Sequence, residues 1–337
     1  MTLARAALSS SLRWIIVLAA LVVAAPSAAR AQSVQELLSA VVRVKAFVPS
    51  DSRTAETLGR EREGSGIVID QAGLVLTIGY LMVEAQGAEV TTADGHTVPA
   101  QVVGYDHESG FGLLRADPPP RVKPMAMGRS ADVKDRDPVL VASYGGPDMA
   151  GPAFVVAKRV FAGSWEYLLD DAIFTAPPHP AWSGAALIDR DGRLIGVGSL
   201  IVGDTTGTGT HLPGNMFVPI DRLKPILADL ISDGRVSGPA KPWLGLNTEE
   251  LRGRLFVTRV SPESPAARVG IEPGDVVVGV GTGGETPRDL PDFYRKVWAL
   301  GSAGVEVPLR VLHGSTMRDV TIKSIDRRDH LRIGRTY

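Results

Sequence analysis

One serine lies in a loop whose residue types could support nucleophilic chemistry. Ser183 is part of the segment H-P-A-W-S-G-A-A-L, residues 179–187, in which small residues and a glycine favour a tight turn beside the hydroxyl. A serine nucleophile needs a base to take its proton, an acid to orient that base, and backbone N–H groups aimed at the developing oxyanion. Ser183 is therefore the candidate nucleophile, and its partners must come from elsewhere.

Four basic side chains could in principle activate this serine. They are His96, His107, His179 and Lys158. A base must reach hydrogen-bond distance of the hydroxyl, and His179 would have to fold back onto its own loop to do so. We expect all four to be solvated surface side chains, because nothing in the sequence brings any of them to Ser183.

Short strands separated by turns must position the serine loop. Apolar and β-branched runs recur between Gly, Pro and Asp clusters, a pattern typical of a β-barrel or sandwich. The expected strands include 41–48, 67–69, 74–77, 88–92, 98–104, 111–115, 138–142, 153–161, 185–188, 194–197 and 216–220. The segment 49–63 is expected to be an exposed loop, and Pro219 to Ile231 is expected to be a helix.

The last part of the chain reads as a separate domain. It follows a linker-like stretch, Ser237-Gly238-Pro239-Ala240. Strands are expected at 255–260, 276–280, 305–312 and 317–325, with a short helix over 266–268. A second helix is expected over Leu290 to Leu300, with Asp289 as its N-cap and Pro291 in its first turn.

Composition narrows the function classes. The chain has 337 residues, 36 Lys+Arg against 37 Asp+Glu, 37 Gly, 24 Pro and no Cys. A net charge of −1 gives little attraction to phosphates, so no nucleic-acid partner is expected. Without cysteine there can be no disulfide, thiol catalysis or Cys-ligated zinc. We expect neither a metal nor a cofactor.

The first 31 residues read as an export signal. A basic start precedes an apolar run from Trp14 to Ala25, which stops at Pro26, and a small-x-small cleavage site ends at Ala31. The run is shorter than the roughly 20 apolar residues of a spanning helix. We therefore expect cleavage after Ala31, no stable membrane span afterwards, and a periplasmic or secreted mature protein.

Three sequence motifs of the mature chain, in their order, resemble those of the HtrA/Deg branch of trypsin-like serine proteases. The family pattern D-G-x-x-x-P-A-x-V-V-G-x-D is matched by residues 94–106, and its nucleophile loop by residues 179–187. The PDZ pattern S-P-A-A-x-x-G-I-x-x-G-D is matched by residues 264–275. The resemblance covers nearly the whole mature chain.

The resemblance implies an all-β-dominated fold, in which a trypsin-like double β-barrel precedes a PDZ domain of strands and two short helices. The implied domains are a signal peptide at 1–31, a trypsin-like domain at 32–232, a linker at 233–241 and a PDZ domain at 242–330. The segment 32–45 lacks the aromatic residue that often supports trimers in this family.

The catalytic positions depart from the family pattern. The resemblance places Tyr80 where the catalytic His stands and Gly110 where the Asp stands, and it leaves Ser183 as the nucleophile. Neutral tyrosine, with a pKa near 10, cannot act as the base, and glycine has no side chain. Ala181 replaces the oxyanion-loop glycine, and Trp182 replaces a smaller residue.

The PDZ residues match the family pattern more closely than the catalytic positions do. The resemblance implies a carboxylate loop at Trp243, Leu244, Gly245 and Leu246, whose N–H groups would hold the C-terminal carboxylate of a peptide. The groove would be lined by Leu290, Phe293 and Val297, which could equally serve only to pack the core. We expect a β-branched residue at Gly245 to abolish peptide binding and leave the fold intact.

Two functions remain in competition. The first is an HtrA-like pseudoprotease that binds peptides or unfolded envelope proteins in protein quality control, or regulates an active HtrA-like relative. The second is a serine-type endopeptidase that degrades misfolded periplasmic proteins with a non-standard base. Tyr80 and Gly110 favour the first.

Overall fold

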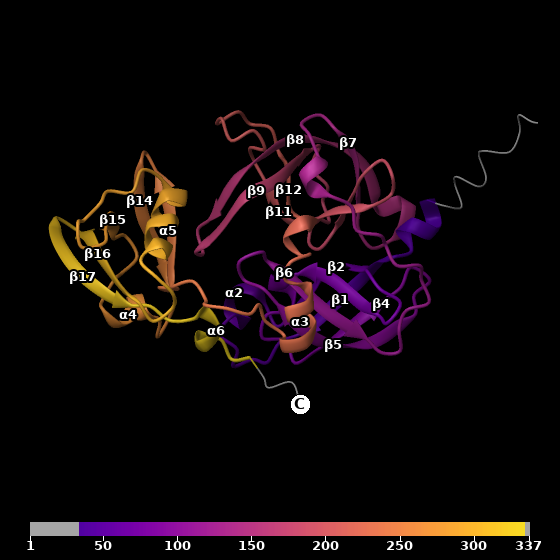
Figure 1. Ribbon diagram of the computed structural model, residues 1–337, viewed down its shortest axis with the longest axis horizontal. Coiled ribbons are helices and arrows are strands. Elements are labelled where there is room, and N and C mark those ends of the chain that lie inside the picture. Colours follow the sequence, from indigo (N-terminus) through magenta and orange to yellow (C-terminus); the bar gives the residue numbers. More distant parts are fainter. Residues whose placement is uncertain (1–33, 334–337) are drawn as a thin grey trace, which may run out of the picture.

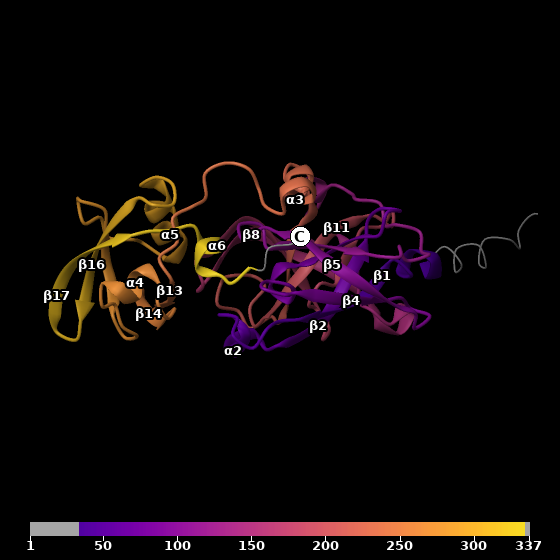
Figure 2. The same cartoon turned by 90° about the horizontal axis from the view of Figure 1, so that it is seen from below.

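The computed structural model describes residues 34–333, and the predicted export signal with its expected cleavage site after Ala31 lies outside them. Two closed β-barrels lie one above the other, and the C-terminal sheet lies beside them (Figure 1). The chain crosses to this sheet through the linker after α3, which is clear in the second view (Figure 2). The expected all-β-dominated double barrel and separate C-terminal domain are confirmed.

The first barrel closes in the order β1-β2-β3-β6-β5-β4. Its strands are β1 Val41–Phe47, β2 Glu61–Val68, β3 Leu74–Ile78, β4 Gly87–Thr91, β5 Thr97–Tyr105 and β6 Phe111–Ala116. Strand β3 is buried along its whole length, because Val75 packs inside the first barrel and Leu74, Leu76 and Ile78 pack in a cluster shared with the second barrel. The short 3-10 turn η1 (Gly79–Leu81) follows β3 directly and carries Tyr80.

The second barrel closes in the order β10-β11-β12-β9-β8-β7. Its strands are β7 Pro138–Ala142, β8 Ala150–Gly163, β9 Tyr167–Ala176, β10 Ala186–Ile188, β11 Leu194–Val202 and β12 Gly214–Pro219. The long hairpin of β8 and β9 extends out of the barrel toward the C-terminal domain (Figure 1). Ser183 lies in the loop between β9 and β10.

The C-terminal domain is a five-stranded antiparallel sheet in sequence order. Its strands are β13 Leu246–Leu251, β14 Arg254–Val260, β15 Val276–Val280, β16 Glu306–His313 and β17 Thr316–Lys323, and its helices are α4 Pro265–Arg268 and α5 Leu290–Ala299. The predicted N-cap of α5 is confirmed, since the Asp289 carboxylate accepts from the Asp292 N–H at 2.7 Å. Strand β13 is an edge strand, so one side of its backbone is free to pair.

The remaining short elements are α2 Ala55–Leu58, α3 Leu227–Asp233, α6 Arg327–His330 and the 3-10 turns η2 Ser130–Asp132, η3 Gly146–Met149 and η4 Ile220–Arg222. The predicted continuous helix from Pro219 to Ile231 is wrong, because it is split into η4 and α3. Pro225 lies between them, and a proline cannot donate the hydrogen bond that would join them. The expected loop 49–63 likewise contains α2 and the start of β2.

Candidate functional site

Tyr80 of the first barrel faces Ser183 of the second. The Tyr80 hydroxyl lies 2.9 Å from Ser183 Oγ and 3.0 Å from the carbonyl oxygen of Ser199. The Tyr80 hydroxyl is the donor in both contacts, so its one proton is shared between two acceptors, Ser183 Oγ and the Ser199 carbonyl oxygen. The group that faces Ser183 is therefore a protonated phenol that donates to the serine oxygen, and such a group cannot take the serine proton.

The environment of Tyr80 keeps it neutral. Burial raises the pKa of Tyr80 to about 12, and its hydrogen bonds with the Ser183 and Trp182 side chains oppose this rise only in part. With that pKa, about one molecule in 10⁵ carries a tyrosinate at pH 7. Arg62 fixes the turn that holds this side chain, since it donates to the Tyr80 carbonyl at 2.9 Å.

A second tyrosine, Tyr167, lies against Gly110, the residue that the resemblance places at the position of the catalytic acid. The Gly79 N–H donates to the Gly110 carbonyl at 2.7 Å, which brings Gly110 next to η1. Gly110 has a left-handed φ of +85°, and a Cβ built on it would lie 2.9 Å from the hydroxyl oxygen of Tyr167. This hydroxyl donates to the Ser109 carbonyl at 2.7 Å. A carboxylate at residue 110 would therefore need Tyr167 to move.

Backbone contacts hold the serine loop against the first barrel. The Ser65 N–H donates to the Ser183 carbonyl at 2.8 Å. Gly184 has a φ of +72°, and a Cβ there would lie 1.9 Å from the Ser65 carbonyl oxygen, so only glycine fits. Ser143 Oγ donates to the carbonyl of Ala181. The loop is thus tightly placed although Ala181 and Trp182 depart from the family pattern.

None of the four alternative bases contacts Ser183 in the described structure, in which the only side chain hydrogen-bonded to Ser183 Oγ is that of Tyr80. Lys158 Nζ instead donates to the Ser130 carbonyl at 2.7 Å, and His179 Nδ1 lies 3.5 Å from Ser143 Oγ. The expectation that all are solvated surface groups is confirmed for His96 and wrong for the others.

The environments of His107 and His179, which are both partly exposed, come from long-range packing. The Nε2 atom of His107 is enclosed and has no hydrogen-bond partner among residues 34–333, and burial lowers its pKa well below the usual value. Burial likewise lowers the pKa of His179, whose backbone N–H donates to Asn215 Oδ1 at 2.6 Å. Both rings are therefore neutral at pH 7, and neither has a geometry for catalysis at Ser183.

The expected carboxylate loop precedes strand β13. Gly245 has a φ of +88°, and a Cβ on it would lie 2.2 Å from Cβ of Ser264, the N-cap of α4. A β-branched residue at Gly245 would therefore disturb the fold, which corrects the expectation that only binding would suffer. Leu244 and Leu246 are buried, and Trp243 is nearly so.

The side chains of Leu290, Phe293 and Val297 are also buried, within the hydrophobic cluster of the C-terminal domain. Phe293 is fully enclosed, so its first role is packing. The neighbouring Tyr294, which the sequence did not single out, has its hydroxyl directed at the β8–β9 hairpin, where it donates to the Gly163 carbonyl at 2.7 Å.

The carboxylate loop already holds an anionic side chain. The Glu166 carboxylate accepts from the N–H groups of Leu244, Gly245 and Leu246 at 2.9, 2.6 and 2.8 Å. Burial raises the pKa of Glu166 to about 7, although these three hydrogen bonds and Arg327 act in the opposite direction. Nothing in the sequence pointed to Glu166, which lies 80 positions before Leu246.

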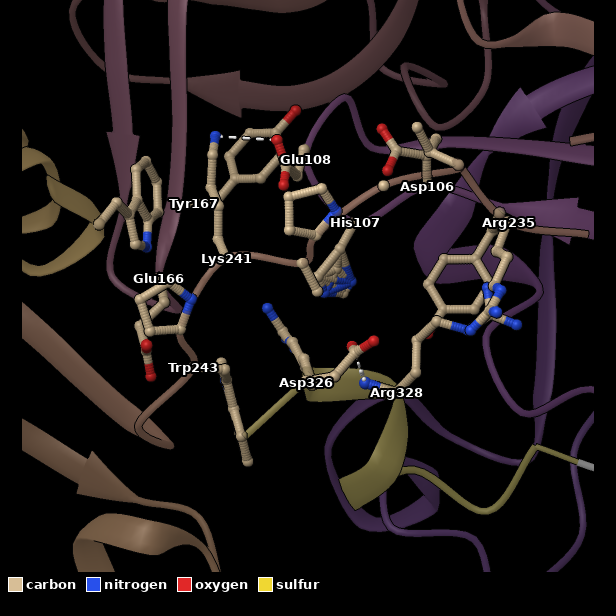
Figure 3. Close-up of a pocket in the computed structure, with 18 of the residues that line it drawn as sticks. Asp106, His107, Glu108, Glu166, Tyr167, Arg235, Lys241, Trp243, Asp326 and Arg328 are labelled. Carbon is tan, nitrogen blue, oxygen red and sulfur yellow. Dashed lines mark hydrogen bonds and ion pairs between the residues drawn. The ribbon is translucent and has the colours of Figure 1, made fainter. Parts of the chain in front are cut away.

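A cavity of about 340 Å³ lies between the barrels and the C-terminal domain, away from Ser183. Glu166 and Arg235 lie at opposite ends of it, and Glu108 is paired there with Lys241 Nζ at 2.9 Å (Figure 3). Among residues 34–333 no three His, Asp or Glu side chains gather as they would around a metal ion. No helix in the same range is long and apolar enough to cross a membrane.

Comparison with known families supports both domains. The trypsin-like peptidase domain family matches residues 64–197, and the PDZ domain family matches residues 242–324. The chain is 27% identical over 281 residues to a probable periplasmic serine endoprotease DegP-like of Halomonas elongata, covering 78% of this chain and 56% of that protein. It is 28% identical over 253 residues to the serine endoprotease DegS of Haemophilus influenzae, covering 71% of each.

The chain thus spans little more than half the length of some relatives. Another example is the serine protease PepD of Mycobacterium tuberculosis, which is 29% identical to this chain, and the alignment covers 55% of PepD. Among solved structures, the HtrA-type protease AlgW with decapeptide aligns with a TM-score of 0.52 and 22% identity, covering 90% of this chain and 98% of that one. At this identity the structural likeness concerns the fold.

Proposed function

The chain is a homologue of the HtrA/DegP proteases with a trypsin-like peptidase domain and a PDZ domain, and from this premise we propose that it is a peptide-binding pseudoprotease. The contact between Tyr80 and Ser183 carries the proposal. The group at the base position is a neutral phenol, and the acid position holds Gly110 with Tyr167 against it. Among residues 34–333, Ser183 therefore has no hydrogen-bonded side chain that could accept its proton.

The proposed ligands are extended peptides or unfolded envelope proteins that reach the PDZ domain. Three N–H groups converge at Gly245, the geometry that holds a C-terminal carboxylate in a backbone nest. The related AlgW structure was solved with a decapeptide, which supports peptide binding by this kind of chain. An active HtrA-like relative is a second proposed partner, through which the protein would regulate proteolysis.

The proposed location is the periplasm or the exterior of the cell. The basic start, short apolar run and small-x-small site of the first 31 residues support export. The name of the Halomonas elongata relative points to the same compartment. Sequencing the N-terminus of the exported protein would test the proposal, and Gln32 is the expected first residue.

A serine-type endopeptidase with a non-standard base is the alternative. Two observations favour it: Ser183 is retained and only partly buried, and the related proteins are named as serine proteases. In this case a group outside the triad positions would have to take the serine proton during reaction.

A fluorophosphonate probe distinguishes the two functions, because it reacts with an activated serine. The mature protein is incubated with the probe and with casein, beside its Ser183→Ala variant and an active HtrA relative. The proposal expects neither labelling nor cleavage by the wild type. Stoichiometric labelling of the wild type that is lost in Ser183→Ala would establish the endopeptidase instead.

A further inference from the structure

The tip of the β8–β9 hairpin, residues 163–167, lies in the groove of the PDZ domain. It comes between the edge strand β13 and helix α5. The Thr248 N–H of β13 donates to the Ser164 carbonyl at 2.8 Å. From the other side, the Tyr294 hydroxyl of α5 donates to the Gly163 carbonyl at 2.7 Å. The hairpin tip therefore makes a backbone hydrogen bond with the free edge of the sheet, which is the edge where an extended peptide binds in this kind of domain.

The hairpin tip also presents a side-chain carboxylate to the PDZ domain. Glu166 Oε1 accepts from the N–H groups of Gly245 and Leu246, and Oε2 accepts from that of Leu244. Three consecutive N–H groups are thus satisfied by the two oxygens of one carboxyl group. A buried carboxylate without such donors would be strongly unfavourable, so the position of Glu166 depends on this loop.

Further contacts hold the hairpin in place. Leu168 is part of the hydrophobic cluster of the PDZ domain, although it belongs to the second barrel. Arg327 of α6 donates to the Trp165 carbonyl at 3.0 Å and faces Glu166 with its positive charge. Glu166 itself has a left-handed φ of 58°, an uncommon conformation for a residue with a side chain. It is the conformation that the last residue of a three-residue hairpin loop normally adopts, and Gly163 and Tyr167 close such a loop here.

We infer that the β8–β9 hairpin is an intramolecular ligand of the PDZ groove, in which the Glu166 carboxylate takes the place of the terminal carboxylate of a bound peptide. This inference rests on the proposed peptide-binding function and adds a competitor to it. A partner must then be an extended chain with a free C-terminal carboxylate, since it has to replace both the three contacts of Glu166 and the strand contact of Ser164.

The test compares Glu166→Ala with the wild type in the mature full-length protein. Glu108→Ala is the matched control, because Glu108 is another glutamate beside the same cavity and pairs with Lys241 rather than with the loop. The probe is a fluorescein-labelled decapeptide that ends in valine with a free carboxylate, and its C-terminal amide controls for charge. A second readout is amide hydrogen exchange of residues 244–248 without peptide.

We expect Glu166→Ala to bind the peptide at least about tenfold more tightly than the wild type, since the competing carboxylate is gone. The same variant should exchange the amides of residues 244–246 at least about tenfold faster. Glu108→Ala should match the wild type in both readouts. If Glu166→Ala fails to fold, Glu166→Gln keeps the side-chain length and should show the same changes to a smaller extent.

The two readouts separate the inference from the proposed function. Unchanged exchange and unchanged peptide affinity in folded Glu166 variants would overturn the intramolecular ligand while peptide binding stands. Faster exchange without binding of the decapeptide to either protein would keep the intramolecular ligand and count against peptide binding. Equal binding of the acid and the amide would overturn the role given to the carboxylate.

Discussion

Supplying the two missing catalytic partners should not restore a protease. The perturbation is the double change Tyr80→His and Gly110→Asp. It supplies a base and an orienting acid at the two positions that the resemblance assigns to them. In Ser–His–Asp enzymes, loss of the base costs on the order of 10⁶ in kcat and loss of the acid on the order of 10⁴. Tyr80→His alone should therefore regain at most about 10² over the wild type.

The structure explains why Gly110→Asp should add nothing. The residue must adopt a φ of +85°, and its Cβ would lie 2.9 Å from the Tyr167 hydroxyl oxygen. The left-handed backbone and this contact together should cost about 1–3 kcal/mol of stability. Urea unfolding of Gly110→Ala measures this cost, and the cost should be smaller in a Tyr167→Phe background because the obstructing oxygen is absent.

The assay is the rate of fluorophosphonate labelling at Ser183, with casein cleavage as a second readout and Ser183→Ala in each background as the control. The double variant should remain at least 10²–10³ below an active relative, because Ala181 and Trp182 still alter the oxyanion loop. Adding Ala181→Gly and Trp182→Asn should recover part of the gap. Full activity in the double variant would refute this reasoning about both Gly110 and the loop.

Three further outcomes are expected. The affinity of the wild type for the peptide should increase up to about 30-fold from pH 5.5 to 8.5. Burial raises the pKa of the docked Glu166 to about 7, so the docked carboxyl group holds its proton below that pH. As the pH rises through this value, docking of the hairpin weakens and the peptide displaces it more easily. Fluorescence anisotropy of the labelled peptide would show this increase. The Glu166→Gln variant should lack it, because Arg327 stays charged and the Tyr294 hydroxyl stays neutral in this pH range. Gly245→Val should lower the unfolding temperature as well as abolish peptide binding, since its Cβ would meet Ser264, and a thermal midpoint equal to that of the wild type would contradict the geometry. Tyr80→Phe should cost about 0.5–1.5 kcal/mol in urea unfolding and leave probe labelling absent, whereas labelling present in the wild type and lost in this variant would make the phenol a participant.

Local patterns in the sequence predicted an all-β barrel or sandwich and a separate C-terminal domain, whereas the double barrel and the positions of Tyr80 and Ser183 came from the resemblance to the HtrA/Deg proteases. Strands and turns depend on alternation and on glycine or proline at nearby positions, and these are visible within about ten residues. The same holds for the N-cap at Asp289, which was predicted correctly. The predicted helix from Pro219 to Ile231 is wrong because Pro225 interrupts it, and this signal is also local.

Tertiary structure alone decided what surrounds these motifs. Tyr167 fills the space at Gly110, and Glu166 occupies the carboxylate loop, because the β8–β9 hairpin reaches from one domain to the other. The pKa of His107 is lowered by burial and by Arg327 and Arg328, which are also far from it in the sequence. These contacts join residues 58 to 80 positions apart, and their energy comes from desolvation and hydrogen bonding between surfaces that the chain brings together only on folding. Neither residue type nor spacing encodes them, so a glutamate in a turn could not be recognised as a ligand before the groove around it was known.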